Sequence, residues 1–305
     1  MSSKTSGSTT ADLYLLFIVV VWASNFSIVK YSLAEIDPYA FNGIRFALGI
    51  ALMWSFAWFK RVRIRVERQD IGRIILLAII GNLLYQMLFI IGIDRTFASN
   101  AAVILGLIPV WITVFSHFFT SEKMYRTQVI GVSAAFAGVA LIIGSGDEGI
   151  SFRSDTLAGD LIILLAAMVF AVYTLLARSM LSKYSPLTLA TMVMTVGGAM
   201  LIFTAIPSLL QMDYGSVSLL SYGGVVYSGL FAIGLAYLIW NFGIKNVGAI
   251  RTATYQNLVP VLGVLFGLIF LGEKLHVLQY LGSLITIGGI VLTRQAGSKS
   301  FKPGG

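Results

Sequence analysis

Uncharged, apolar stretches of about 20 residues recur along this chain, and each is long enough to cross a ~30 Å hydrocarbon core as an α-helix. Of the 305 residues 57% are hydrophobic and 11% are charged, a balance that a water-soluble domain does not show. The sequence therefore predicts an all-α integral membrane protein with ten transmembrane helices. The expected spans are 13–33, 39–59, 71–92, 98–119, 125–144, 158–181, 186–208, 217–242, 249–271 and 275–293.

Basic residues segregate to one side of the predicted membrane. With both termini in the cytoplasm, 15 of the 21 Lys and Arg residues fall on that side, including the cluster from Lys60 to Arg73. Because a cytoplasmic excess of Lys and Arg determines orientation, we expect a multi-pass protein with both termini cytoplasmic. The net charge of +8 comes from short loops and not from one basic face, so a nucleic-acid partner is not expected.

The sequence also resembles itself, at an offset of 151 over residues 92–138 and at an offset of 148 over the leading segments. Five helices per repeat is an odd number, so the second copy enters the membrane from the opposite side. Inverted repeats of this kind are the architecture by which many transporters alternate access around a site near the midplane. A duplication kept for folding alone is the alternative. Matched pairs include Pro38 with Pro186, Pro109 with Pro260, Glu122 with Glu273, Lys123 with Lys274 and Gly138 with Gly289.

The repeats define the expected domain organisation. Residues 1–146 form the first repeat and residues 158–296 the second. We expect residues 147–157, which carry three acidic residues, to be a periplasmic linker, and residues 297–305 to be a disordered tail.

Several motifs stand at matching places in the two halves. The first half contains Trp22-Ala-Ser-Asn25-Phe26, Pro38, Arg45-Phe46 and the run from Ala98 through Pro109 to Glu122-Lys123. The second contains Trp240-Asn241-Phe242-Gly243, Gly248-Ala-Ile-Arg251, Pro260 and Leu271-Gly-Glu273-Lys274. Together they resemble the drug/metabolite transporter superfamily and its paired EamA-type repeats, over nearly the whole chain. Within it the chain looks most like the YddG-type amino acid exporters.

This resemblance implies export of aromatic and other neutral amino acids across a bacterial inner (plasma) membrane by alternating access through a central cavity. Other small metabolites, purines or drugs are the alternative substrates. The implied partners are an amino acid substrate and the lipid bilayer. The sequence leaves open whether the chain acts as a monomer or a weak homodimer.

Two prolines lie near the middle of their predicted spans. A proline ring removes one backbone hydrogen bond and displaces the carbonyl four residues earlier, here at Leu105 and Gln256. A freed carbonyl at membrane depth needs a neighbouring group or a water-filled cavity. We therefore interpret Pro109 and Pro260 as hinges beside the transport pathway, the alternative being fixed kinks used for packing.

Polar and aromatic side chains also lie well inside the spans. A polar group that faced lipid would raise the free energy, so these residues should face the bundle interior. We expect amides and carbonyls to meet the ammonium and carboxylate of an amino acid while tyrosine rings pack on its side chain. Hydrogen bonding between helices is the alternative role. The predicted substrate-binding residues are Asn25, Tyr85, Gln86, Tyr173, Tyr237, Trp240, Asn241, Arg251, Tyr255, Gln256 and Asn257.

Charged residues inside the spans are few. Arg251 is a candidate for holding a substrate carboxylate, but it and Arg45 lie one or two turns from a helix end, where an arginine can instead extend to the lipid headgroups. Asp12, Asp94 and Asp160 fall at span ends. Because proton coupling generally uses a buried carboxylate, we expect facilitated transport, with proton coupling as the alternative. The sequence shows no catalytic constellation, metal-ligand set or phosphate-binding loop, so neither enzymatic activity nor a cofactor is expected.

Overall fold

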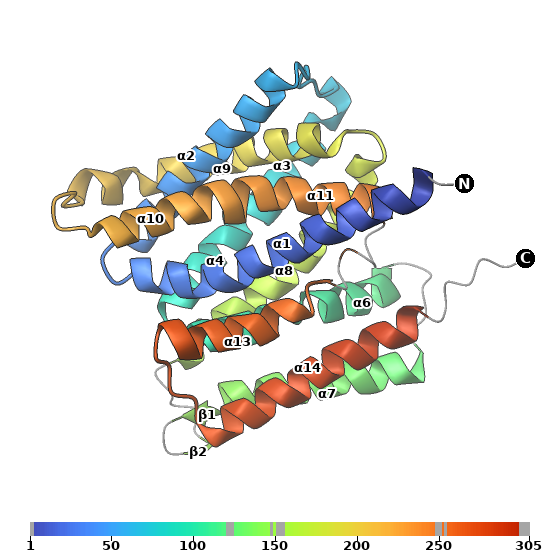
Figure 1. Cartoon of the computed structure of the whole chain (residues 1–305), viewed down its shortest axis with the longest axis vertical. Helices are drawn as coiled ribbons and strands as arrows, with labels where there is room; N and C mark the ends of the chain where they lie inside the picture. Colours follow the sequence, from blue (N-terminus) through green and yellow to red (C-terminus); the bar gives the residue numbers. More distant parts are fainter. Residues whose placement is uncertain are drawn as a thin grey trace, which may run out of the picture.

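The computed structural model consists of helices that lie side by side and run across the view in Figure 1. It describes residues 3–119, 125–146, 149–150, 156–247, 252 and 255–298. Glu122, Lys123, Arg251, most of the expected linker and the end of the expected tail lie outside these described residues. Helix α1 (Ser3–Ser32) begins and helix α14 (Val277–Ser298) ends on the same side of the molecule, at the right of Figure 1.

The first repeat begins with α1, and its third and fourth spans are each built from several segments. The third span contains the 3-10 turn η1 and the π-helical stretch η2, and the fourth is divided into α5 and α6. The segments after α1 are α2 (Pro38–Phe59), η1 (Arg68–Asp70), α3 (Ile71–Ala78), η2 (Ile79–Leu84), α4 (Tyr85–Asp94), α5 (Ala98–Leu105), α6 (Ile108–Phe119) and α7 (Arg126–Ile143).

The second repeat follows a short antiparallel pair of strands, β1 (Ser145–Gly146) and β2 (Gly149–Ile150). Its third span also contains a π-helical stretch, η3. Its segments are α8 (Leu157–Leu181), α9 (Pro186–Gln211), α10 (Leu219–Tyr227), η3 (Ser228–Leu235), α11 (Ala236–Val247), α13 (Leu258–Phe270) and α14.

The helix count agrees with the predicted architecture. Among the described residues, eight helical segments are long and apolar enough to cross a membrane, and α13 and residues Val277–Thr293 of α14 form two shorter apolar helices. The prediction of two inverted five-helix repeats is therefore confirmed. The main difference is the ninth span, expected over 249–271, where a turn at Gln256 and Asn257 precedes α13.

Matching local structure shows why the two halves fold alike. The Asp37 carboxylate accepts hydrogen bonds from the backbone N–H groups of Tyr39 and Ala40 at 2.9 and 3.2 Å, and Pro38 opens α2. At an offset of 148, the Ser185 hydroxyl accepts from the N–H of Thr188 at 3.0 Å, and a proline again opens α9. A side-chain cap satisfies free N–H groups in the first turn, and proline at that position loses no helical hydrogen bond. Each repeat thus starts its second helix by the same chemistry.

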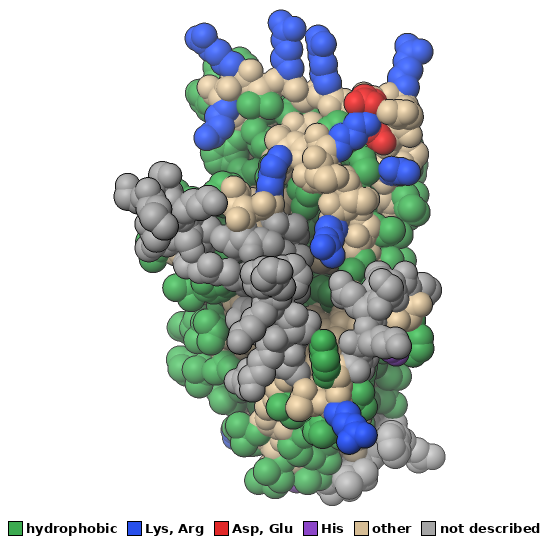
Figure 2. Space-filling view, turned by 90° about the vertical axis from the view of Figure 1, so that its right-hand side faces the viewer, with side chains coloured by type: hydrophobic (Ala, Val, Ile, Leu, Met, Phe, Trp, Pro, Cys, Tyr) green, Lys and Arg blue, Asp and Glu red, His purple; other side chains and the backbone are tan. Residues whose placement is uncertain are grey.

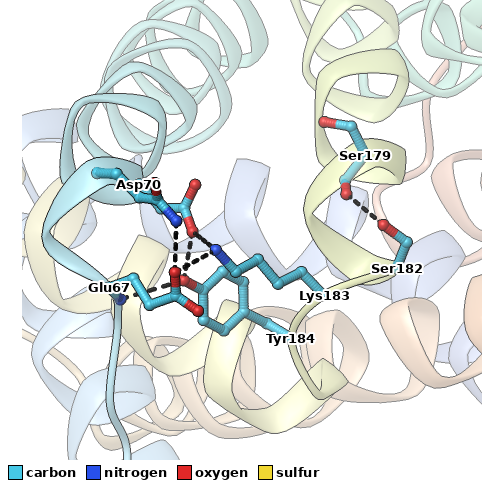
Figure 3. Close-up of polar contacts among 7 residues, drawn as sticks. Glu67, Asp70, Ser179, Ser182, Lys183 and Tyr184 are labelled. Atoms are coloured by element: carbon cyan, nitrogen blue, oxygen red, sulfur yellow. Dashed lines mark hydrogen bonds and ion pairs between the residues drawn. The ribbon is translucent and has the colours of Figure 1, made fainter.

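The contacts between repeats also recur on opposite faces. On the face where the chain ends emerge, the Lys183 ammonium lies 2.6 Å from a Glu67 carboxylate oxygen and 2.5 Å from one of Asp70, and the Tyr184 hydroxyl donates to Asp70 at 2.6 Å (Figure 3). The hydrogen bonds to Asp70 and Glu67 raise the pKa of Lys183. This network joins the α2–α3 connection to the α8–α9 turn.

The equivalent junction on the other face uses different residues. At the offset of 148, Lys183 corresponds to Glu35 and Asp70 corresponds to Ser218. The Glu35 carboxylate accepts a hydrogen bond from the Ser218 N–H at 2.8 Å, and this bond lowers the pKa of Glu35. The inverted symmetry therefore preserves the place of the contact while its charges have changed.

Small residues let α7 and α14 pack closely at the lower edge of the molecule (Figure 1). A Cβ added at Gly289 would lie 2.6 Å from the Gly131 carbonyl oxygen, and one added at Gly138 would lie 2.5 Å from the Gly282 carbonyl oxygen. These four glycines are two repeat-related pairs. Without side chains at these positions the helix backbones approach closely, as in other membrane helix pairs.

Figure 2 shows the face at which α1 begins and α14 ends. Lys and Arg side chains gather along its upper rim, and Asp and Glu are visible there in one small group. The α2–α3 connection lies at the top of Figure 1, and in or near it are the exposed residues Lys60, Arg61, Arg63, Arg65, Arg68 and Arg73. The basic cluster predicted from the sequence is thus on the face that carries the chain ends.

We expect Gly289→Ala to destabilise the protein and Gly288→Ala to leave its stability unchanged. The new Cβ at position 289 meets backbone atoms of α7, whereas the neighbouring position 288 has nothing within 4 Å. Overpacking a tight contact costs about 1–3 kcal/mol. Thermal unfolding of the two purified variants in detergent measures the difference. Equal melting temperatures for both would contradict the close approach of α7 and α14.

Candidate functional site

A cavity of about 70 Å³ lies between the two repeats near the middle of the bundle. Its wall takes side chains from α1, α2, α4 and the α5–α6 break in the first repeat, and from α8, η3, α11 and the start of α13 in the second. Most of the lining is apolar or aromatic. The lining residues are Trp22, Asn25, Phe26, Arg45, Tyr85, Gln86, Phe89, Leu105, Gly106, Ile108, Phe170, Ala232, Ile233, Tyr237, Gln256 and Val259.

Two interrupted spans meet at this cavity. Helix α5 ends at Leu105 and α6 begins at Ile108, so Pro109 lies in the first turn of α6 and loses no helical hydrogen bond there. In the second repeat α13 begins at Leu258, which places Pro260 in its first turn. The breaks are in contact, since a Cβ added at Gly106 would lie 2.5 Å from Cγ of Pro260.

The structure alters one detail of the proline prediction. The Gln256 carbonyl, expected to be freed by Pro260, accepts a hydrogen bond from the Val259 N–H at 3.1 Å. A tight turn of the chain thus supplies the hydrogen bond to the Gln256 carbonyl, because Gln256 lies in a turn and not within a helix. The assignment of Pro109 and Pro260 as hinges stays a prediction.

Arg45 is the unexpected member of the site. Its side chain is 0% exposed and lines the cavity, which contradicts the expectation that it extends to the headgroups. The guanidinium donates from Nε to Asn42 Oδ1 at 2.8 Å, from Nη1 to the Ser228 hydroxyl at 3.2 Å and from Nη2 to Gln86 Oε1 at 2.6 Å. Its carbon Cζ also lies 5.3 Å from the centre of the Phe89 ring. Arg45 thereby connects α2 to both repeats at the cavity.

The hydrogen bond between Gln86 and Tyr237 marks the symmetry axis. Gln86 Nε2 donates to the Tyr237 hydroxyl oxygen at 3.1 Å. The two residues stand 151 positions apart and are equivalent in the repeats. Equivalent residues can touch only close to the pseudo-two-fold axis, so this contact places the cavity on the axis. Both residues follow π-helical stretches, which are often found beside functional sites.

Six of the 16 lining residues are aromatic. The Tyr85 and Phe170 ring centres are 4.6 Å apart, and those of Phe26 and Phe89 are 6.0 Å apart. The Trp22 indole donates to the Ala232 carbonyl at 3.1 Å, which fixes its ring orientation. Such a wall suits a planar or branched apolar group.

Two amide oxygens at the cavity lack hydrogen-bond partners. Asn25 is 6% exposed and Gln256 is 9% exposed, and neither Asn25 Oδ1 nor Gln256 Oε1 has a partner in the described part of the chain. A buried acceptor without a donor raises the free energy by about 1–3 kcal/mol. These oxygens are therefore available to a donor on a bound molecule.

The predicted binding residues divide into two groups. Asn25, Tyr85, Gln86, Tyr237 and Gln256 lie on the cavity wall. Others lie elsewhere: Tyr173 packs against Gly81, Trp240 lies behind Trp22 with ring centres 5.4 Å apart, Asn241 is buried in α11, Tyr255 is half-buried, and Asn257 precedes α13. Arg251 is outside the described residues.

Sequence reasoning also missed several residues. Trp22, Phe26, Phe89 and Phe170 were not selected because aromatic residues are common in any membrane helix. The sequence did contain an indication that Arg45 faces the bundle interior. Asn42 precedes it by one helical turn, so the two polar residues lie on the same face of the helix.

A second polar group lies at the α4–α5 corner, on the face opposite the chain ends. The Lys30 ammonium donates to the carbonyls of Ile93 and Asp94 at 3.1 and 2.7 Å, at the end of α4. The Glu273 carboxylate accepts from the N–H groups of Ala98 and Ser99 at 2.6 and 3.0 Å, at the start of α5. Each charge has the sign that its helix end favours.

A third charged side chain contacts the same corner from α8. Asp160 is fully buried and accepts from the Thr96 hydroxyl at 2.5 Å and from Asn100 Nδ2 at 3.3 Å. Its position at a span end was expected, but its complete burial was not. Gly272, with a φ of +63°, forms the turn that returns Glu273 towards α5. The corner is thus held by α1, by α8 and by the α13–α14 connection.

The described residues contain no group of three His, Cys, Asp or Glu side chains arranged to hold a metal ion. The described residues that line the cavity offer one guanidinium, amides, phenols and aromatic rings.

Comparisons with known proteins agree with this architecture. A relative in Bacillus subtilis (strain 168), the uncharacterized transporter YyaM, is 28% identical over 280 residues, covering 92% of each protein. A probable terminal-alkyne amino-acid exporter of Streptantibioticus cattleyicolor is 25% identical over 281 residues, covering 91% of each protein. One crystal structure shares the fold with a TM-score of 0.69 at 18% identity, covering 97% of this chain and 99% of its own.

The model of the EamA-like transporter family, part of the drug/metabolite transporter superfamily, matches residues 9–144 and again residues 157–295. The two matched segments correspond to the two repeats and together span most of the chain. This multi-pass membrane transporter belongs to the EamA-like transporter family.

Proposed function

We propose that the protein exports amino acids, aromatic and other neutral ones, by alternating access through the central cavity. The observation that carries the proposal is the composition of a cavity on the symmetry axis. One part of its wall is aromatic, and another presents a guanidinium and two amide oxygens without partners. An amino acid offers an apolar side chain to the first, and a carboxylate and an ammonium to the second.

The size of the cavity indicates that loading requires rearrangement. About 70 Å³ is well below the ~300 Å³ at the lower end of the range for ligand pockets. The wall includes both interrupted spans, where few helical hydrogen bonds resist a change of angle. Movement of α6 and α13 about these breaks would enlarge the cavity, which is the role we assign to Pro109 and Pro260.

The α4–α5 corner supplies a gate at one end of the pathway. The contacts of Lys30, Asp160 and Glu273 join this corner to three other parts of the bundle. Opening the cavity to that side would separate some of these groups. We assign the side to the periplasm because the opposite face carries the basic cluster of Figure 2, which places both termini in the cytoplasm of a bacterial inner membrane.

The relative from Streptantibioticus cattleyicolor supports the substrate class, since it is named as a probable amino-acid exporter. Other neutral metabolites or drugs are the alternative cargo. We propose facilitated transport because none of the described residues that line the cavity carries a carboxylate. Proton coupling is the second candidate, and the buried Asp160 carboxylate is the observation that favours it.

We expect proteoliposomes loaded with a neutral amino acid to take up its labelled form by counterflow. The panel consists of phenylalanine, tryptophan, leucine and threonine, with glucose as the negative control. Because no ion is needed for exchange, uptake should be equal with and without an imposed proton gradient. Absence of exchange for every amino acid would remove the substrate assignment, and strict dependence on the gradient would replace facilitated transport with coupling.

Tyr237→Phe should lower counterflow roughly two- to tenfold without lowering membrane abundance. The substitution removes only the hydroxyl that Gln86 contacts on the axis, and a hydrogen bond of this kind contributes about 0.5–1.5 kcal/mol. Tyr173→Phe is the matched control, because that ring is equally buried but lies off the cavity. Full activity in Tyr237→Phe, or an equal loss in both variants, would contradict a role in transport for the hydrogen bond between Gln86 and Tyr237.

Glu273→Gln should expose the cavity more often to the periplasm. The glutamine amide has one acceptor oxygen where the carboxylate has two. One of the hydrogen bonds from the N–H groups of Ala98 and Ser99, at the start of α5, is therefore lost. The chain has no cysteine, and Ala232→Cys therefore provides a single reactive thiol at the cavity wall. The measurement is the rate at which a membrane-impermeant maleimide labels this thiol from outside.

Asp213→Asn is the control for this experiment, since Asp213 lies on the same face but bonds only within its own loop. Labelling should accelerate in Glu273→Gln alone. An unchanged rate would show that the corner does not gate the cavity.

A further inference from the structure

Arg45 carries a buried positive charge, and no described carboxylate forms an ion pair with it. The ion pairs between two described residues are those of Lys183 in the surface network, and Arg45 is in none of them. Arg45 is held by neutral groups instead: an amide of α2, an amide of α4 and a hydroxyl of η3. Burial of an ion in a medium of low dielectric is costly unless an opposite charge compensates it.

The guanidinium retains donors for a further partner. It has five N–H groups in a fixed fork, and three of them serve Asn42, Ser228 and Gln86. One N–H on each terminal nitrogen therefore remains, and two such groups match the two oxygens of a carboxylate. Arg45 is part of the cavity wall but 0% exposed, so a ligand reaches these groups when the cavity enlarges as proposed above.

The backbone adds to this positive potential. The N-terminal ends of α6 and α13 both lie at the cavity, marked by Ile108 and by Val259. A helix N-terminus carries a partial positive charge, and in transporters the ends of interrupted helices commonly face the anionic group of a substrate. Among the described lining residues no acidic side chain opposes these charges.

We propose that Arg45 binds the carboxylate of the cargo, so that a carboxylate is a requirement for transport. The inference rests on the proposed function, and it names the group by which the cavity recognises its substrate. The ammonium then meets the unpartnered oxygens of Asn25 and Gln256, and the side chain packs among the aromatic rings. Gln86, held by Tyr237, positions the guanidinium.

The first experiment uses the wild-type protein. Counterflow of labelled phenylalanine is measured against an excess of phenylalanine, of phenylalaninamide, of phenethylamine and of 3-phenylpropionate. The amide and the amine lack the carboxylate, and hydrogen bonds to a charged group are stronger than those between neutral groups. Both should therefore compete on the order of 10- to 100-fold less well than phenylalanine. The acid without an ammonium should compete better than either of them, because it keeps the carboxylate.

A variant series identifies the residue responsible. Arg45→Gln should abolish the preference for phenylalanine over its amide, and Arg45→Lys should retain part of it because the positive charge remains. Arg178→Gln removes an exposed arginine of α8 and should leave the preference unchanged. Membrane abundance and melting temperature show whether each variant folds. The competition experiment on the wild type tests the proposal even if Arg45→Gln does not fold.

The outcomes distinguish a failure of the proposed function from a failure of the role proposed for Arg45. Absence of counterflow for every amino acid in the wild type would overturn the proposed function itself. Robust amino acid exchange that the amide and amine inhibit as well as phenylalanine does would overturn the role of Arg45 alone. An unaltered preference in a folded Arg45→Gln variant would likewise assign the carboxylate to another group.

Discussion

Inside a lipid bilayer every backbone N–H and C=O group must find its partner within the protein, and the rest of this structure depends on that constraint. It forces the chain into helices wherever lipid is near. It also makes any interruption informative, because free backbone groups are tolerated only where protein or a cavity surrounds them. The two interrupted spans, at Gly106 and at Gln256, both border the central cavity. The site is therefore located where the backbone departs from regular helix.

Duplication and inversion explain why the site lies on an axis. Residues related by the repeat meet each other only at that axis, as Gln86 meets Tyr237 and as Thr286 approaches the Ala135 carbonyl at 3.5 Å. Away from the axis the two copies have diverged, so that a lysine at position 183 corresponds to a glutamate at position 35. Backbone geometry has been conserved between the halves, while side-chain chemistry has adapted to two different membrane faces.

The sequence predicted the spans and the inversion because both depend on long-range patterns, namely apolar length and a constant offset. It predicted the cavity less completely, since a polar residue that faces the bundle interior need not face a void. Tyr173 and Asn241 face inward but pack between helices, whereas Asn25 and Gln256 reach the cavity. Arg45 was misjudged because distance from a helix end does not reveal direction. Its neighbours on α4 and η3, which hold the guanidinium in place, are separated from it by 41 and 183 residues.

The inverted fold also determines the electrostatics of the cavity before any side chain contributes. Residues 108–119 of α6 correspond to residues 259–270 of α13 at the offset of 151, so the pseudo-two-fold axis carries one helix N-terminus onto the other. Both positive ends therefore lie at the axis, and their potentials add there. Arg45, which has Val193 as its repeat equivalent, increases this potential from one side only. The symmetric backbone thus favours an anionic group at the centre, and the asymmetric arginine determines which way that group, and with it the whole cargo, is oriented.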